Sequence, residues 1–178
     1  FAFLLLVVVL IAGIGRMAGG ARRWIDLGPI GVQAGEVMKL ALIVWLARSL
    51  AEKVQDGRIL RFSTGVLPHI LVPGLAVVLL LGEPDFGTSA MLLLVTFLLL
   101  FVAGARLGIL FGVVVAAVPI GLHLIASSQY RMLRVLAFLD TWAHRKDIGY
   151  QITESLMTFG SGGFFGAGLG ESKQKLFF

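Results

Sequence analysis

Two long stretches without any charge constrain this chain more than any other feature. They cover residues 86–105 and 107–129 and are separated only by Arg106. A helix rises about 1.5 Å per residue, so either stretch can cross the roughly 30 Å hydrocarbon core of a bilayer. The chain is also 58% hydrophobic with a mean hydropathy of +0.95, which leaves too little polar surface for a soluble globule of 178 residues. The sequence therefore predicts a membrane protein.

Three further apolar stretches raise the expected number of spans to five. They cover residues 1–15, 37–50 and 66–82. The third contains Pro68 and Pro73, which a helix bundle tolerates because neighbouring helices can satisfy the freed carbonyls. The expected fold class is all-α, a polytopic bundle of transmembrane helices over residues 1–126, followed by a polar and then glycine-rich segment over residues 127–178.

The ends and the charges set further expectations. The chain opens on Phe inside an apolar stretch with no basic leader, which suggests an internal piece of a longer protein.

Lys and Arg occur in the connections on both expected sides, so the positive-inside rule leaves the orientation open. If the side with residues 16–33, 82–88 and 129–178 faces outward, its positive charge calls for an anionic partner such as lipid phosphate. The absence of cysteine excludes disulfides and thiolate chemistry.

Glu36 and Lys39 are the first candidate site residues. They lie three apart, so on a helix they share a face and can pair. An ion pair inside a membrane is costly unless it faces a polar cavity, which favours a functional role. A solvated helix end is the equally weighted alternative.

Glu83 and Asp85 flank Pro84 between two expected spans. Two carboxylates at a membrane boundary can raise one pKa, bind a divalent cation, or act as acid or base. The alternative, slightly favoured on the residues alone, is a tight turn whose acidic residues stabilise a helix N-terminus beginning at Thr88.

Two other patterns carry less weight. The glycine-rich run 160–170 lacks a preceding strand and the Lys-Ser/Thr pair of a phosphate loop, so it favours a re-entrant or membrane-surface loop. His69, His123 and His144 show no ligand spacing, which favours packed or hydrogen-bonded roles over metal binding.

Four motifs in order resemble the SEDS family, which contains the cell-division protein FtsW and the rod-shape protein RodA. They read GARRWIDLGPIGVQAGEVMK, LGEPDFGTSAML, YRMLRVLAFLD and GYQITESLMTFGSGGFFGAGLGESKQKL, and the GLGESKQKL ending is more similar to the FtsW branch. The resemblance covers essentially the whole chain. It implies a ten-span protein of the bacterial cytoplasmic membrane, of which residues 1–126 hold the third to seventh spans and residues 127–178 part of a large extracytoplasmic loop.

The resemblance also implies a function and partners. The family polymerises lipid II into peptidoglycan glycan strands, at the septum in the FtsW branch, and works with a class B penicillin-binding transpeptidase. A lipid II flippase and a non-catalytic division scaffold are the alternatives. No cofactor is implied with certainty, a Mg²⁺ or Mn²⁺ ion stays open, and nucleic acid is not an expected partner.

Departures from the family pattern affect the expected site. The usual Gln-Pro-Ser-Glu is replaced by Gln33, Ala34, Gly35 and Glu36, and the usual Gln-Pro-Asp by Glu83, Pro84 and Asp85, which adds a carboxylate. The usual Pro-Trp appears as Thr141 and Trp142. The family's catalytic aspartate belongs to a motif beyond residue 178, so this chain alone is expected to be inactive and no residue here inherits that role. Candidate substrate-binding residues are Arg22, Arg23, Trp24, Glu36, Lys39, Glu83, Asp85, Arg131, Arg134 and Lys175.

Overall fold

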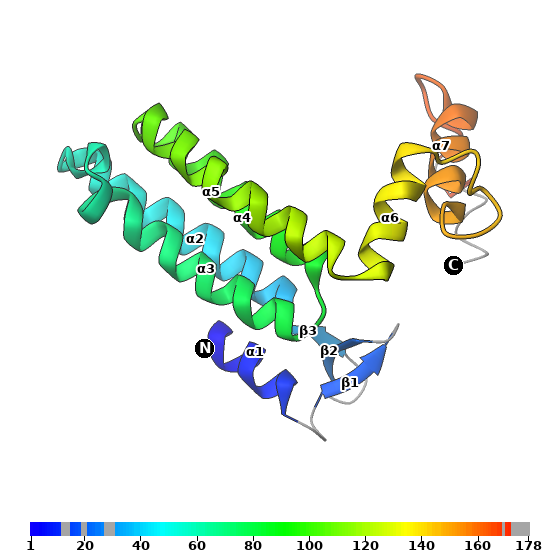
Figure 1. Cartoon of the computed structure of the whole chain (residues 1–178), viewed down its shortest axis with the longest axis horizontal. Helices are drawn as coiled ribbons and strands as arrows, with labels where there is room; N and C mark the ends of the chain where they lie inside the picture. Colours follow the sequence, from blue (N-terminus) through cyan, green and yellow to red (C-terminus); the bar gives the residue numbers. More distant parts are fainter. Residues whose placement is uncertain (12–14, 19–20, 27–30, 169, 172–178) are drawn as a thin grey trace. The chain divides into compact units, whose positions relative to one another are not determined.

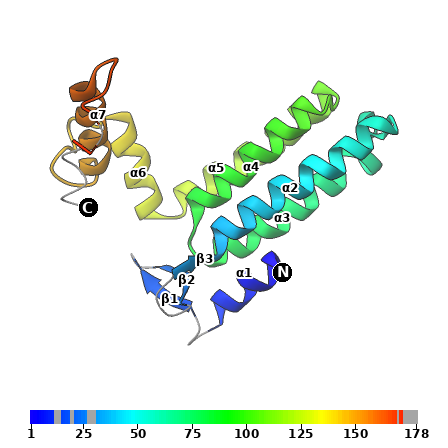
Figure 2. The same ribbon diagram turned by 180° about the vertical axis from the view of Figure 1, so that it is seen from behind.

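A computed structural model describes residues 1–11, 15–18, 21–26, 31–168 and 170–171, and it divides the chain into two compact units, Phe1–Val114 and Val115–Phe178. Helices dominate both units (Figures 1 and 2). In chain order the elements are α1 (Ala2–Leu10), β1 (Gly15–Ala18), β2 (Ala21–Asp26), β3 (Gly31–Gln33), α2 (Ala34–Gln55), η1 (Arg58–Leu60), η2 (Phe62–Val66), α3 (Leu67–Gly82), α4 (Phe86–Val102), α5 (Leu107–Ala126), α6 (Gln129–Leu139) and α7 (Tyr150–Gly162).

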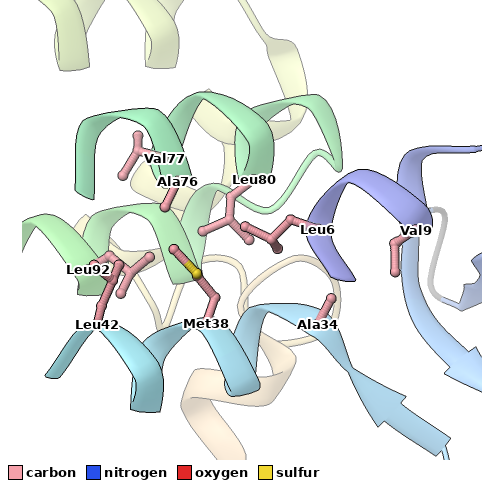
Figure 3. Packing of buried hydrophobic residues seen from close by; sticks show 9 residues of the cluster. All are labelled: Leu6, Val9, Ala34, Met38, Leu42, Ala76, Val77, Leu80 and Leu92. Atoms are coloured by element: carbon pink, nitrogen blue, oxygen red, sulfur yellow. The ribbon is translucent and has the colours of Figure 1, made fainter. Parts of the chain in front are cut away.

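The first unit is built around α2, α3 and α4, which run side by side in both views (Figures 1 and 2). Short α1 packs against α2 and α3 at the end where α2 begins. Their shared core contains Leu6, Met38, Leu80 and Leu92, one from each of these four helices, all at most 1% exposed (Figure 3). This packing fixes the start of α2 against the end of α3, which is where the candidate site lies.

Large apolar side chains cover the outside of the helices as well as the inside. Leu98 and Phe101 of α4 and Phe111, Val115 and Leu122 of α5 are all exposed. A helix that is apolar all round suits a hydrocarbon environment rather than water. The chain is a helical membrane protein.

Five spans were expected, and the structure confirms fewer by length and hydropathy. Among the described residues, Phe62–Gly82, which joins η2 to α3, and Leu107–Ala126 are long and apolar enough to cross a membrane. Helix α4 is as apolar but has 17 residues. The stretch expected to end at residue 15 is helical only over Ala2–Leu10. The span expected over residues 37–50 is instead a longer helix, Ala34–Gln55, whose charged residues lie near its two ends.

Residues 16–33 were expected to form a polar connection between spans. The structure instead shows a three-stranded sheet of order β1-β2-β3 there. Both pairings are antiparallel, with Arg16 opposite Trp24 and Ile25 opposite Val32, and a bulge interrupts β1 between Arg16 and Met17. Strand pairing satisfies backbone N–H and C=O groups that would otherwise lack partners at a membrane edge. The sheet holds β2 at a defined place beside the helices.

In the second unit, α6 and α7 are joined by a turn that requires glycine. A Cβ at Gly149 would lie 2.9 Å from the His144 carbonyl oxygen and 3.0 Å from that of Thr141. Buried Thr153 of α7 donates to the Gly149 carbonyl at 2.9 Å. Helix α7 continues through Gly162, so the loop expected from residue 160 begins later than predicted.

Candidate functional site

The candidate site is the turn of residues 83–85, which joins α3 to α4. The turn contains two of the predicted carboxylates, and both are buried, with Glu83 1% and Asp85 5% exposed. Strand β2 and the first turn of α2 pack around it and bring in a cation and a close backbone contact. The site therefore joins three parts of the sequence, and Arg23 and Asp85 lie sixty-two residues apart.

Asp85 is the N-cap of α4. Its carboxylate accepts a hydrogen bond from the Thr88 backbone N–H at 3.2 Å and another from the Thr88 hydroxyl at 2.8 Å. The Ser89 hydroxyl donates to the Asp85 carbonyl at 2.8 Å. A capping side chain satisfies N–H groups that the first helical turn leaves free. The prediction that acidic residues here stabilise a helix start is confirmed for Asp85, although α4 begins at Phe86 rather than at Thr88.

Arg23 of β2 ties the sheet to this turn. Its Nη2 donates to the Pro84 carbonyl at 2.7 Å, and its Nη1 lies 3.9 Å from Asp85 Oδ1. The second distance marks an ion pair without a short hydrogen bond. Arg23 retains 31% of its side-chain exposure. Arg23 thus contacts the turn while part of its side chain stays exposed.

Glu83 differs from Asp85 because its carboxylate accepts no hydrogen bond from the described residues. Within the described residues, neither of its buried carboxylate oxygens has a hydrogen-bond partner. Burial, together with the negative charge of Asp85, raises the pKa of Glu83 to about 7, against the smaller opposing effect of Arg23. The predicted coupling of two neighbouring carboxylates therefore acts on Glu83, which lies just outside the spans.

Gly35 lets the first turn of α2 approach the site closely. A Cβ at this position would lie 3.3 Å from Leu80 Cδ2, 3.3 Å from Thr88 Cγ2 and 3.7 Å from Asp85 Oδ2. Contacts of 3.3 Å are tight for a real Cβ, so a larger residue requires Leu80 and Thr88 to shift by a few tenths of an ångström, and Thr88 is the donor to Asp85. Gly35 is one of the departures from the family pattern, and through this contact it affects the turn from outside.

Glu36 and Lys39 form the predicted ion pair on α2, with 2.8 Å between Lys39 Nζ and Glu36 Oε1. The Glu36 side chain is 54% exposed and the Lys39 side chain 24% exposed. Within the described residues the pair therefore lies at the surface rather than deep in a polar cavity. This geometry favours the solvated alternative.

The remaining predicted residues lie elsewhere on β2, in the second unit, or outside the described residues. Trp24 follows Arg23 on β2 and is partly exposed. Arg131 and Arg134 belong to α6 in the second unit, where Arg131 donates to the Leu124 carbonyl and Arg134 lies 4.7 Å over the Tyr130 ring. The side chain of Arg22 and all of Lys175 fall outside the described residues.

Sequence reasoning gave His69 a packed or hydrogen-bonded role, and the structure confirms this. His69 is fully buried, with Nδ1 at 2.6 Å from the Gly65 carbonyl and Nε2 at 2.9 Å from the Ser49 hydroxyl. A carbonyl only accepts, so Nδ1 carries the proton and Nε2 accepts from Ser49. Ser49 and the acceptor carbonyl of Pro84 were missed, because no local pattern signals a contact between separate elements. Thr88 was overlooked as a hydrogen-bond donor, although an Asp directly before an apolar helix is a recognisable N-cap signal.

The described residues of this site offer few ligands for a divalent cation. Over the part of the chain that the structure describes, no three His, Cys, Asp or Glu side chains form a group that could hold a metal ion. Two carboxylates suffice for Mg²⁺ only when substrate phosphates or water complete the shell. A requirement for Mg²⁺ or Mn²⁺ stays a prediction.

Comparison with known proteins identifies the family. The family described as cell cycle protein (FTSW_RODA_SPOVE) matches residues 1–178. Probable peptidoglycan glycosyltransferases FtsW are 43% identical over 99% of this chain in Geobacter sp. (strain M18), 44% over 98% in Legionella pneumophila and 46% over 99% in Saccharophagus degradans. The chain spans 47%, 44% and 45% of those relatives, a little under half of their length.

A solved structure agrees with this assignment. A chain of a peptidoglycan synthase complex, described as coordinating polymerization and crosslinking, is 31% identical and superposes with a TM-score of 0.65. The match covers 86% of this chain and 44% of that one. At this level of identity, sequence and fold support the same conclusion. The chain belongs to the FtsW/RodA/SpoVE family of cell cycle proteins.

Proposed function

We propose that this chain forms part of a peptidoglycan glycosyltransferase that polymerises lipid II in the bacterial cytoplasmic membrane. The observation that carries the proposal is the identity of 43–46% over nearly the whole chain to relatives named as such enzymes. The match to a peptidoglycan synthase complex supports the same class of reaction. The burial of charged residues at the α3–α4 turn adds a polar site at the end of a helix bundle in a chain rich in apolar surface.

In the proposed reaction, a carboxylate takes the proton from a sugar hydroxyl of the acceptor lipid II. The oxygen then attacks the anomeric carbon of the growing strand, and undecaprenyl pyrophosphate leaves. We assign the role of the base to no residue of this chain. Its own residues instead bind and orient the substrate.

Arg22 and Arg23 are the proposed pyrophosphate-binding residues, because guanidinium groups bind phosphate oxygens in pairs. Trp24 lies beside them, and Arg131, Arg134 and Lys175 are further candidates on the extracytoplasmic side. Glu36 and Lys39 line the approach. Since Arg23 already contacts the Pro84 carbonyl and Asp85, it binds pyrophosphate either with its exposed edge or after leaving the turn.

A transpeptidase is the proposed partner, since the matched synthase complex couples polymerization to crosslinking. A class B penicillin-binding protein fits this role, and the division septum is the proposed location of the pair, since the similar relatives are named FtsW. Copurification of the full-length protein with such a transpeptidase tests the partnership separately from the activity.

The experiment that tests the function uses the purified full-length protein with labelled lipid II. Glycan polymer on a gel supports the enzyme. Transfer of labelled lipid II across vesicle membranes without polymer would support a flippase instead. If neither activity were detected, the result would support a non-catalytic scaffold. Parallel reactions with a chelator and with added Mg²⁺ or Mn²⁺ test the metal requirement.

A further inference from the structure

Three buried side-chain atoms in the described part of the chain lack a hydrogen-bond partner, and all three belong to one place. They are both carboxylate oxygens of Glu83 and the Nε of Arg23. An ionised carboxylate that is buried without donors is far costlier than the neutral acid. The geometry therefore favours Glu83 in its protonated form.

The cation beside Glu83 is already engaged. Arg23 donates to the Pro84 carbonyl at 2.7 Å and faces Asp85 at 3.9 Å. The packed elements add little, because α1, β3 and α4 carry no ionisable side chains, α3 carries only His69, and Glu36 and Lys39 of α2 pair with each other. The other charged residues of the sheet are Arg16, Arg22 and Asp26, whose side chains lie outside the described part.

We propose that Glu83 is a positioning residue that keeps Arg23 on Asp85 and the Pro84 carbonyl for as long as Glu83 carries its proton. Among the described side chains, a neutral Glu83 leaves Asp85 as the one carboxylate that the guanidinium balances. Ionisation adds a second buried carboxylate two residues away, and the two then compete for one guanidinium. The contact to Asp85 is long, so it is readily exchanged.

The consequence reaches the strand that carries Arg23. Strand β2 also carries Arg22 and Trp24, so a change in the Arg23 contact moves the residues proposed to bind pyrophosphate. The raised pKa of Glu83, about 7, places this exchange near neutral pH. The effect on the reaction rests on the proposed function, whereas the protonation itself does not.

The test uses the full-length protein in lipid nanodiscs and two readouts that need no activity. Infrared difference spectra between about pH 5 and about pH 9 report the carbonyl stretch of a protonated carboxylic acid that ionises near neutral pH. Fluorescence of Trp24, with the other tryptophans replaced by Phe, reports movement of β2. Wild type should lose the carbonyl band and change Trp24 fluorescence with a common midpoint near 7.

Glu83→Gln mimics the protonated acid and should abolish both transitions. Glu52→Gln is the matched control, because Glu52 is an exposed carboxylate that pairs with Arg48 at the other end of α2, and it should keep both. Asp85→Asn should lower the midpoint by about one pH unit or more, because it removes a negative neighbour and frees Arg23 for Glu83. This third variant keeps the test decisive if Glu83→Gln does not fold.

Two results would overturn the inference. One is the absence of a protonated carboxyl group in wild type that ionises near neutral pH, and the other is a Trp24 transition that persists in Glu83→Gln or does not shift in Asp85→Asn. The polymerisation rate measured over the same pH range should depend less on pH in Glu83→Gln than in wild type. A protein that never polymerises lipid II would refute the proposed function and leave the spectroscopic result standing.

Discussion

Asp85 has two roles that different substitutions can separate. It caps α4 through Thr88, and it supplies the negative charge that faces Arg23. Asparagine caps almost as well as aspartate, whereas alanine does not cap at all. We therefore expect Asp85→Ala to lower the free energy of unfolding by about 1–2 kcal/mol and Asp85→Asn by clearly less.

If the charge serves the reaction, Asp85→Asn should impair polymerisation while membrane abundance stays near normal. Denaturation in detergent and a lipid II polymerisation assay measure the two effects on the same preparations. Wild-type activity in Asp85→Ala would reduce the motif to a helix cap.

Glu83 predicts a dependence of stability on pH. Its pKa is raised from 4.5 to about 7 in the folded protein, mainly by burial, so the folded state binds the proton more tightly than the unfolded state does. The stabilising contribution is complete below about pH 4.5 and is lost as the pH rises through about 7. Relative to Glu83→Gln, wild type should lose thermal stability across this window and then level off. A constant difference between the two proteins at every pH would contradict the shift.

At the same scale, the sequence singled out Arg23, Glu83 and Asp85 as candidates but did not indicate how they meet. Glu83 and Asp85 were recognisable because they interrupt an apolar sequence, and the cap was a stated alternative. The pairing of Arg23 with Asp85 was not predictable, because the two residues lie sixty-two positions apart and only the packing of β2 against the helices joins them. The lack of donors to Glu83 among the described residues is likewise a property of the folded chain.

Among the elements, α2 and α3 are joined by a polar contact inside an apolar bundle. Ser49 of α2 donates to His69 Nε2, and Trp45 stacks near the same ring at 5.4 Å. Interhelical hydrogen bonds in membrane proteins contribute about 0.6 kcal/mol on average. A double-mutant cycle with Ser49→Ala and His69→Phe should give a coupling energy of about 0.5–1 kcal/mol in detergent unfolding.

Ser127→Ala is the control for that cycle, since its hydroxyl donates only within its own segment, to the Leu124 carbonyl. It should show no coupling to His69. Strictly additive effects of the Ser49 and His69 substitutions would show that the contact contributes nothing to helix association.

For the Glu36–Lys39 ion pair on α2 we expect a weaker coupling than for the Ser49–His69 contact. Because Glu36 is more than half exposed, the coupling energy in a double-mutant cycle should not exceed about 0.5 kcal/mol. Folded yield in the membrane is a suitable measurement. If either single substitution proved much more harmful than the double one, the pair would be buried in the full-length protein and would belong to a polar cavity.

Element boundaries followed the sequence where hydropathy alone decides them. The two uncharged stretches became α4 and α5, and each helix starts at the first residue of its stretch. The sheet was missed because short antiparallel strands depend on pairing between segments, and no clear alternation of apolar and polar residues announces β2. Helix α2 exceeded its predicted length because its ends carry charged residues, which a hydropathy criterion excludes although they favour helix.

For the whole molecule, the net charge of +5 and the basic residues around β2 leave two explanations that substitution can separate. If Arg22 and Arg23 clamp pyrophosphate through paired hydrogen bonds, lysine is a poor replacement, because an ammonium group keeps the charge but lacks the planar fork. If they only attract anionic headgroups, lysine serves nearly as well, since that attraction is worth about 1 kcal/mol per charge.

Arg22→Lys and Arg23→Lys should be compared for apparent lipid II affinity at two salt concentrations, because screening weakens headgroup attraction more than a buried clamp. Arg23 needs a stability measurement in parallel: a lysine cannot contact the Pro84 carbonyl and Asp85 in the same way, so Arg23→Lys is expected to loosen the turn in either case. Arg22→Lys therefore gives the cleaner answer. Affinity equal to wild type at both salt concentrations for Arg22→Lys, and for Arg23→Lys once its stability is matched, would refute the clamp and leave headgroup attraction as the role of this charge.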